Sequence, residues 1–384
     1  MADRLFLYTM QFPFGNGEAF LEAEINILAS TFRNIDIIPL NFGGDERKLP
    51  KNVNVINLSE IEGTARGALS YFFKAKMKLS FLMDIRYQWQ NFKQIMVKSD
   101  MLFNFLKNKE GVHYSYWMDE WATILSLVKN RGRIDGFISR AHGFDLYEER
   151  AKLGYRPWRQ FVLGNITKVY TVSRMGAEYL NELYPNHKKK FTHSYLGSAD
   201  YGRSNLVNNE SFHLVSCSNV IPLKRVDRIV KALAITKAKI QWTHIGTGGE
   251  IVAVKKLAEN LPPNVTHEFL GSISHDEVMN HYKNNTVDCF INVSTTEGLP
   301  VSMMEAISFG IPILATDVGG VREIVTNQTG TLLAADFTDE LLALEIENLV
   351  GRKASFSKDE IREFWSKNFS AKENYKVFGE NIRG

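Results

Sequence analysis

The sequence predicts an α/β protein made of two Rossmann-like domains. Its 384 residues are too many for one ordinary hydrophobic core, so a division into two domains is expected. In both halves of the chain, short apolar runs with β-branched residues alternate with amphipathic segments. That alternation is typical of parallel strands joined by crossover helices. The clearest example runs from residue 287 to residue 325.

This stretch predicts two buried strands that are each followed by a helix. The apolar runs and the glycines that end them place these elements at Val287–Val293, Ser302–Phe309, Ile311–Ala315 and Val321–Val325. Such a βαβα unit makes its strands parallel neighbours with a right-handed crossover. The loops after parallel strands lie at the carboxyl edge of the sheet, where open α/β sheets bind ligands. We therefore expect these loops to contact a ligand.

Two carboxylates belong to this unit. Glu297 is in the loop after the first strand, and Glu305 is eight positions later on the following helix. Each carboxylate also has a simpler interpretation. In that interpretation, Glu297 would be a solvated loop acid. Glu305 would form a capping box with Ser302 and would only satisfy a backbone donor.

The spacing of Glu297 and Glu305, with Gly298-Leu299-Pro300 after the first acid, resembles the retaining glycosyltransferases of family four. The resemblance covers most of the chain; it is specific from Phe212 to Leu333 and general before that. It implies the GT-B fold, in which two Rossmann-like domains face each other across a cleft, and a second domain that binds a nucleotide-diphosphate sugar. It also implies no cofactor and no metal, and the sequence has no Asp-x-Asp motif to hold a metal.

Other donor-binding residues follow from the same resemblance. Lys224 matches the lysine of the family's Arg-x4-Lys-Gly diphosphate element, but Asn219 replaces the arginine and Arg225 replaces the glycine. Cations at a helix entrance oppose the helix dipole unless an anion is shared there, which favours a phosphate site. The alternative is a solvated basic turn. Gly271 ends the strand that, in the family, meets the nucleotide base.

The first half of the chain contributes a glycine loop and a histidine. Gly15 and Gly17 lie between the strand Arg4–Thr9 and a helical segment, which is a suitable place to bind an anion. The alternative is a plain strand–helix turn. His142 follows the strand at 136–139, at the carboxyl edge of the predicted sheet, and the resemblance implies that it contacts the transferred sugar. The alternative is a histidine packed against Phe144.

The domain boundaries follow from these elements. We expect an acceptor-side domain at 1–204, a nucleotide-sugar domain at 205–360, and a terminal helical segment at 361–384 that crosses back to the first domain. Lys168–Ser173 resembles the closing strand of the first domain. Asn205–Glu210 has the composition of a polar linker, and Ile361–Phe378 has the pattern of one helix.

The segment Thr64–Asp100 is unusual because it holds seven basic and two acidic residues, with aromatic residues interleaved. A basic, aromatic, largely helical segment can lie on an anionic membrane surface. The alternative is a pair of helices that cover the sheet with one face and expose their lysines to water. Periodicity does not separate the two.

Composition excludes several classes of protein. The net charge of +3 does not favour a nucleic-acid binder. Two cysteines, Cys217 and Cys289, are too few for a disulfide framework and fit a reducing compartment. The start of the sequence has no apolar signal-peptide core, and no run is long enough to span a bilayer. We expect a cytoplasmic protein that is either free or peripheral at the inner face of the membrane.

The resemblance to family four implies a retaining hexosyltransferase of bacterial polysaccharide synthesis, acting on a glycan or a lipid-linked acceptor. Lys224 would neutralise the diphosphate, Glu305 would accept from the ribose hydroxyls, and Glu297 and His142 would hold sugar hydroxyls. Two alternatives are a nucleotide-sugar epimerase on the same fold and a non-catalytic module that binds a nucleotide sugar or a glycan.

Overall fold

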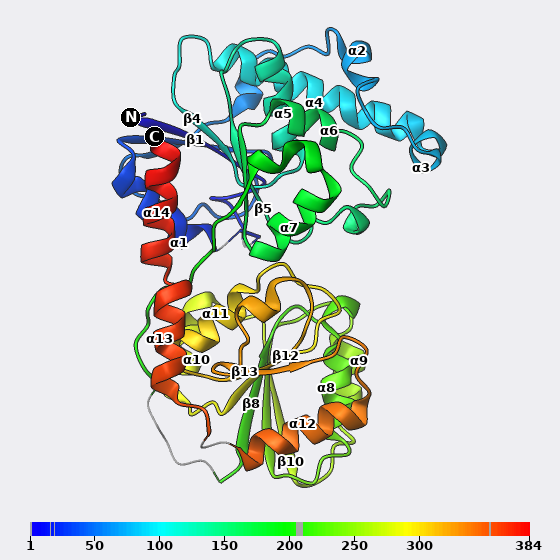
Figure 1. Ribbon diagram of the computed structural model, residues 1–384, viewed down its shortest axis with the longest axis vertical. Helices are drawn as coiled ribbons and strands as arrows, with labels where there is room; N and C mark the ends of the chain where they lie inside the picture. Colours follow the sequence, from blue (N-terminus) through cyan, green and yellow to red (C-terminus); the bar gives the residue numbers. More distant parts are fainter. Residues whose placement is uncertain (1, 16, 19, 205–209, 353–354) are drawn as a thin grey trace. The chain divides into compact units, whose positions relative to one another are not determined.

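The chain forms two compact α/β units. The computed structural model describes residues 2–15, 17–18, 20–204, 210–352 and 355–384. One unit consists of residues 1–195 with 373–384, and the other of residues 196–372 (Figure 1). Each unit has one parallel sheet, which confirms the prediction of two Rossmann-like domains. The division falls before the expected boundary at 204/205, and residues 205–209 of the expected linker lie outside the described residues.

The first domain has a seven-stranded parallel sheet in the order β3-β2-β1-β4-β5-β6-β7. Its strands are β1 (Arg4–Thr9), β2 (Asn34–Pro39), β3 (Val53–Val55), β4 (Val112–Ser115), β5 (Ile138–Ala141), β6 (Lys168–Thr171) and β7 (Phe191–His193). The prediction that the strand at Lys168–Ser173 closes this sheet is wrong. The short strand β7 pairs with β6 and forms the edge of the sheet. It has only three residues, so the sequence gives little indication of a strand there.

The strand β1 shows how this sheet is buried on both faces. All of its residues after Arg4 are buried, so it has the continuous apolar sequence of a covered parallel strand. Leu5 and Leu7 belong to a cluster with α1 (Leu21–Thr31) and α14 (Ala371–Arg383). Phe6 and Tyr8, which point to the other face, belong to a cluster with α5 (Glu120–Asn130).

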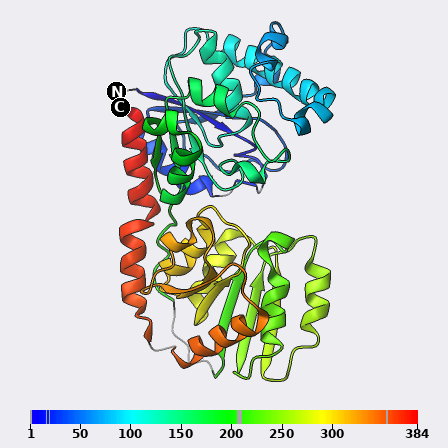
Figure 2. The same cartoon turned by 45° about the vertical axis from the view of Figure 1, so that its right-hand side comes forward.

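The remaining helices of this domain include the segment that the sequence marks as basic and aromatic. It forms α2 (Ala68–Phe72), α3 (Leu79–Met83) and the long α4 (Ile85–Phe105). Figures 1 and 2 show α2 and α3 beside the N-terminal end of α4. The other elements are η1 (Leu58–Glu60), η2 (Glu148–Arg150), α6 (Arg159–Asn165), α7 (Arg174–Leu183) and η3 (Pro185–Lys190).

The second domain has a six-stranded parallel sheet in the order β10-β9-β8-β11-β12-β13. Its strands are β8 (Phe212–Cys217), β9 (Ile240–Ile245), β10 (Val265–Gly271), β11 (Cys289–Asn292), β12 (Ile313–Thr316) and β13 (Gly330–Leu333). Its helices are η4 (Pro222–Lys224), α8 (Val226–Leu233), α9 (Ile251–Ala258), α10 (His275–Asn284), α11 (Val301–Ser308), η5 (Gly319–Glu323), α12 (Asp339–Gly351) and α13 (Lys358–Asn368).

Two predicted helices differ in the structure. The expected helix at Val321–Val325 is the 3₁₀ turn η5, which begins at Gly319 because the loop carbonyl of Glu297 leaves no room for a Cβ there. The expected helix at Ile361–Phe378 is interrupted after α13. Phe369 leaves helical geometry with φ −129° and buries its side chain, and Ser370 pairs with Ser198.

The strand orders define one switch point in each sheet. In the second domain, β8 and β11 are neighbours, and the chain leaves them in opposite directions along the sheet. In the first domain, β1 and β4 have the same relation. Open α/β sheets bind ligands beyond the carboxyl ends of the strands at such points. The loops after β8, β11, β1 and β4 are therefore the places to look for a site.

Candidate active site

The switch point of the second domain brings Lys224 and Glu297 together. Lys224 ends the turn after β8, and Glu297 lies in the loop after β11. The Lys224 ammonium donates to Oε1 of Glu297 at 2.6 Å, and the amide of Asn292 donates to the same oxygen at 3.1 Å. The two charged side chains are 21% and 10% exposed, so solvent still reaches the lysine. The two charged residues named from separate motifs thus form one pair.

The backbone around Glu297 is held by two glycines. A Cβ on Gly319 would lie 2.1 Å from the carbonyl oxygen of Glu297. The amide of Gly320 donates to the carbonyl of Gly298 at 2.8 Å. Leu299 is buried, and Pro300 caps the start of α11 without a side-chain hydrogen bond. The loop at 297–300 therefore has a fixed path into the helix.

Arg225 fixes the loops rather than facing open solvent. It has a left-handed backbone with φ 50° and caps the start of α8. Its guanidinium donates to the carbonyl oxygens of Val293 at 2.6 Å, Ser294 at 3.1 Å and Ala335 at 2.9 Å. Burial, with nearby Arg228, lowers the pKa of this guanidinium from its ordinary value. The contacts tie the loop after β8 to the loop after β11.

Glu305 pairs with a histidine instead of forming a capping box. Its Oε1 is 2.7 Å from Nε2 of His275, the first residue of α10. The helix α11 begins before Ser302 and has no side-chain cap, so the capping alternative for Glu305 is excluded. The described capping box with both reciprocal bonds is at the start of α10, between Ser274 and Glu277. It places His275 next to Glu305.

The glycines after β9 and β10 form a tight crossing beside this site. Gly271 has φ +70°, and its carbonyl accepts from the amide of Gly246 at 2.8 Å. A Cβ on Gly246 would lie 2.0 Å from the carbonyl of Ser218, in the loop that leads to Lys224. The predicted position of Gly271 at a strand end is confirmed, and it is connected through Gly246 to the loop that leads to Lys224.

In the first domain, His142 is held between aromatic rings. Its ring centroid lies 4.3 Å from that of Trp117 and 4.7 Å from that of Tyr116. Its Nδ1 is 3.7 Å from a carboxylate oxygen of Asp145, and neither ring nitrogen has a hydrogen-bond partner among the described residues. Phe144 packs on Trp117, so the predicted alternative of packing against Phe144 is replaced by packing against Trp117.

Asp145 organises the turn that carries His142. One oxygen accepts from the amide of His142 and the other from the amide of Met118, each at 2.7 Å. Burial would raise the pKa of Asp145, but these bonds and the nearby imidazole hold it below its ordinary value. The loops after β4 and β5 are therefore joined by one charged carboxylate.

The glycine loop of the first domain is closed by Glu18. This buried carboxylate accepts from the amides of Gln11 at 2.7 Å and Phe12 at 2.6 Å, and from the indole of Trp117 at 2.5 Å. Gly15 has φ +60°, and its amide donates to the carbonyl of Asp45 at 3.2 Å. Gly17 is also described, whereas Asn16 between them lies outside the described residues. Glu18 thus occupies the amides at the end of β1, where the sequence favours an exogenous anion.

Several of these contacts have only a weak signal in the sequence. Glu18 reads as the first residue of an amphipathic helix, yet α1 begins at Leu21 and leaves Glu18 in the loop. His275 follows a recognisable Ser-x-x-Glu capping pattern, which predicts a helix start but no partner for the histidine. Trp117 lies two residues after the end of β4, and its position next to His142 depends on the pairing of β4 with β5.

Residues 199–368 match the family model described as "Glycosyl transferases group 1". A GDP-mannose-dependent monoacylated alpha-(1-6)-phosphatidylinositol monomannoside mannosyltransferase of Corynebacterium glutamicum is 27% identical over 172 residues, which cover 42% of this chain and 44% of that protein. The chain spans less than half the length of the curated relatives it matches.

Solved structures are similar over nearly the whole chain. The lipopolysaccharide outer core galactosyltransferase WaaB in its apo form has a TM-score of 0.70 and 15% identity, and covers 99% of this chain and 98% of that chain. Anabaena HepE in complex with UDP has a TM-score of 0.70 and 14% identity, and covers 99% of each chain. These similarities show the predicted GT-B fold.

Proposed function

We propose that the chain is a glycosyltransferase that moves a sugar from a nucleotide-diphosphate sugar to a glycan or glycolipid acceptor and retains the anomeric configuration. The observation that carries the proposal is the pair of Lys224 and Glu297 at the switch point of the second sheet, inside the region 199–368 that matches the group 1 family. A cation that solvent still reaches and a carboxylate at that point are suited to a phosphorylated sugar.

The pair gives both residues a role in one exchange. In the described structure, Glu297 holds the Lys224 ammonium. A diphosphate carries more negative charge than one carboxylate, so the Lys224 ammonium would move from Glu297 to the diphosphate and stabilise it as it leaves. Glu297 would then be free to accept a hydrogen bond from a sugar hydroxyl. Positive charge at the leaving group is then supplied by the protein, and we propose that the reaction needs no metal or cofactor.

The other donor contacts are assigned around this exchange. Glu305 would accept from the ribose hydroxyls, and the strand end at Gly271 would lie beside the base. Backbone amides of Gly298 and Leu299 and those at the start of α11, after Pro300, would face the diphosphate, since helix N-termini favour anions. We assign Arg225 an indirect role in donor binding, because it ties together the loops that carry Lys224 and Glu297.

We further propose that His142 donates a hydrogen bond to a hydroxyl of the transferred sugar. Its two ring nitrogens are buried and have no hydrogen-bond partner among the described residues, and packing between Trp117 and Tyr116 fixes the ring. We assign the glycine loop of Gly15 and Gly17 to the same donor. The contact would come from Gly17, because the amide of Gly15 already donates to the carbonyl of Asp45.

The experiment is a thermal-shift screen against UDP- and GDP-sugars, followed by mass spectrometry of the acceptor product and NMR of the new anomeric centre. A donor at a hundred times its Kd should add about 2.7 kcal/mol of stability. Release of an isomerised donor in the absence of acceptor would indicate an epimerase instead. Donor binding without hydrolysis or transfer would indicate a binding module.

We also propose that the first domain contacts an anionic membrane through a basic tip, which we define as residues 66–87. Its inner side chains, such as Phe72 and Phe81, are buried against α4. Its outer side carries large exposed apolar side chains, with Leu79 at 75% and Met83 at 79% exposure. Among the described residues, no helix is long and apolar enough to cross a bilayer. Exposed apolar groups ringed by cations match the interface of an anionic membrane.

The basic tip is tested with anionic vesicles. The parent protein should sediment with them at low salt and be released at high salt, because each Lys or Arg near the surface contributes about 1 kcal/mol and is screened by salt. Reversing Lys74, Lys76 and Lys78 to Glu should abolish sedimentation without loss of thermal stability. The control reverses Lys255, Lys256 and Lys283 of the second domain. If the parent and the Lys74, Lys76 and Lys78 variant both sediment, or if neither does, the basic tip is excluded as the contact.

A further inference from the structure

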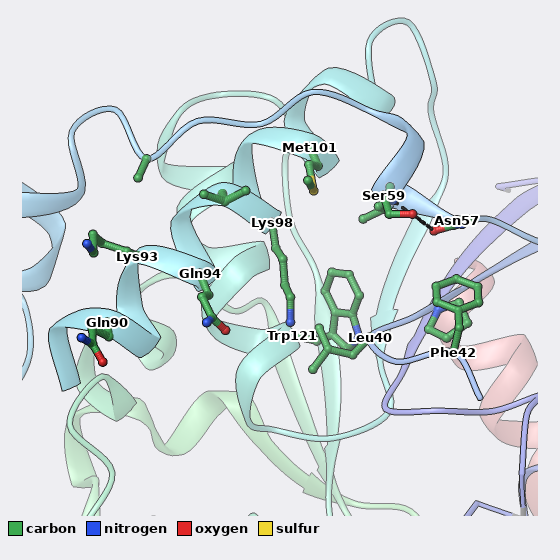
Figure 3. Close-up of a pocket in the computed structure, with 14 residues that line it drawn as sticks. Leu40, Phe42, Asn57, Ser59, Gln90, Lys93, Gln94, Lys98, Met101 and Trp121 are labelled. Carbon is green, nitrogen blue, oxygen red and sulfur yellow. Dashed lines mark hydrogen bonds between the residues drawn. The ribbon is translucent and has the colours of Figure 1, made fainter. Parts of the chain in front are cut away.

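An apolar pocket of about 710 Å³ lies in the first domain, between α4 and the carboxyl ends of β2 and β3 (Figure 3). Its walls include Leu40, Val97, Met101 and the buried ring of Trp121. Six of its lining residues recur along α4 at positions 90, 93, 94, 97, 98 and 101, which is one face of the helix. The volume is that of a ligand site rather than a packing defect.

The charges around this pocket are cationic. None of the residues that line it is Asp or Glu, and two of them are Lys93 and Lys98. The Lys98 ammonium is paired with Glu120 at 2.9 Å, and Figure 3 shows its side chain extending toward Trp121 and Leu40. Lys93 is exposed and is 5.9 Å from the ring of Trp89, without a described carboxylate partner. The pocket thus combines carbon walls with a cation at its rim.

A polar recess of about 570 Å³ adjoins the apolar pocket. The two share Leu40, Gln94 and Lys98. The recess is lined by many polar groups, Asp119 among them, and it includes Met118. The amide of Met118 and the amide of His142 both donate to Asp145, so one buried carboxylate links the wall of the recess to the turn that carries His142.

We propose that the apolar pocket binds the hydrocarbon chain of a lipid phosphate acceptor, with its phosphate at Lys93 and Lys98 and its sugar end in the polar recess. This inference rests on the proposed glycosyltransferase function and names the class of its acceptor. A sugar alone would leave its hydroxyls against carbon walls, which is unfavourable, whereas a hydrocarbon chain is stabilised there.

The helix α4 connects this pocket with the basic tip. Its first turn, at Ile85, belongs to the tip, and its pocket face begins at Gln90. At about 1.5 Å of rise per residue, the pocket starts less than 10 Å along the helix from the tip. A lipid drawn from a membrane at the tip would reach the pocket along one continuous surface.

The test measures binding by calorimetry with alkyl phosphates, below the concentration at which they aggregate. The affinity should rise about two- to fourfold for each CH₂ added from butyl to octyl phosphate, because each buried CH₂ leaves water. Octyl phosphate should bind at least tenfold more tightly than inorganic phosphate or octanol. An affinity that does not change with chain length would overturn the proposal.

Two variants locate the site. Val97→Trp fills the pocket and should weaken octyl phosphate at least tenfold, whereas the matched change Val252→Trp, at a position 77% exposed on α9, should not. Lys93→Gln should weaken octyl phosphate about threefold or more and leave octanol unchanged, with Lys107→Gln as its control. Thermal unfolding of each variant establishes that it is folded. Equal binding by Val97→Trp and the parent would overturn the site.

Failure of this proposal is distinguishable from failure of the proposed function. Alkyl phosphate binding needs neither a donor nor turnover, so binding by a chain without transferase activity would overturn only the function. Conversely, a chain that transfers sugar to a glycan with the same KM in the parent and in Val97→Trp, and binds no alkyl phosphate, would remain a glycosyltransferase with a different acceptor.

Discussion

The candidate sites of the two domains differ in how their charges are arranged. In the second domain, each functional carboxylate has a partner within hydrogen-bond distance, Glu297 with Lys224 and Glu305 with His275. In the first domain, His142 lies between aromatic rings with no hydrogen-bond partner for its ring nitrogens among the described residues, and the neighbouring pocket has largely carbon walls.

Under the proposed function, the difference follows from what each half would recognise. A diphosphate needs a fixed cation, and an ion pair keeps that cation in place at little cost until the ligand arrives. An acceptor with an apolar part needs instead a pocket whose shape matches it and whose walls are largely carbon. The family match at 199–368 is consistent with this division, because it covers the half in which the charged pairs lie. The four predictions below test the comparison, from the largest expected effect to the smallest.

The largest effect is expected at the ion pair of the second domain. Lys224→Ala should reduce turnover about a hundredfold or more, because the diphosphate loses its cation as it departs. Lys231→Ala removes a cation from the exposed face of α8 and serves as the control. Steady-state kinetics with the donor found in the screen measure both. A Lys224 variant with turnover near that of the parent would contradict the phosphate role.

In the first domain, the expected effect is smaller and separates activity from stability. His142→Phe keeps the packing on Trp117 but removes the proposed hydrogen bond to the sugar, so turnover should fall about tenfold or more. Its melting temperature should fall little, because the replaced nitrogens have no hydrogen-bond partner among the described residues and Asp145 keeps the amides of Met118 and His142. Loss of stability with unchanged turnover per folded molecule would show that His142 is structural.

The third prediction separates the two partners of Glu305. Glu305→Gln should weaken donor binding about tenfold, because a hydrogen bond to a charged acceptor contributes about 1.5–3 kcal/mol. His275→Ala removes the 2.7 Å contact with Glu305 but leaves the carboxylate, so donor affinity should be retained. Calorimetry with the donor compares the two variants. Equal losses would mean that the carboxylate acts by holding His275 rather than by binding ribose.

The smallest effect is expected in the pH dependence of stability. Burial lowers the pKa of His244 and His281 in the second domain to about 4. The unfolded chain takes up these protons near pH 6.5, whereas the folded domain resists them, so stability is full above pH 6.5 and falls as the pH drops toward 4. Each histidine contributes about 1.4 kcal/mol per pH unit in that window. His244→Asn should reduce this slope in urea unfolding between pH 7 and 5; an unchanged slope would contradict the assignment.

Most of the fold could be predicted because parallel strands that are buried on both faces leave continuous apolar runs. The strand β1 begins and ends at the predicted residues, and β11 and β12 overlap the predicted runs Val287–Val293 and Ile311–Ala315. The functional loops could be placed for the same reason, since each follows such a strand. Glu297 and Lys224 were recognisable from motif spacing, although their mutual bond depends on the neighbouring positions of β8 and β11.

What the sequence could not predict depends on long-range contacts. Glu18 has the pattern of a helix residue, but its carboxylate is used by three backbone amides and by Trp117, which is far away in the sequence. The capping box considered at Ser302 has the right spacing, yet the helix already begins at Val301. The carboxylate of Glu305 contacts His275 instead. The break between α13 and α14 likewise depends on Ser198.

The helix α14 has a consequence for the synthesis of the protein. Its Phe378 packs on Tyr114 and Tyr170 and lies 4.0 Å from the guanidinium of Arg140, a side chain with no solvent exposure. A ribosome completes β7 and then the whole second domain before it makes α14. At about 5–20 residues per second, the nascent first domain waits on the order of ten seconds or more with this charged, aromatic surface uncovered. Molecular chaperones therefore have a defined surface to protect during that interval.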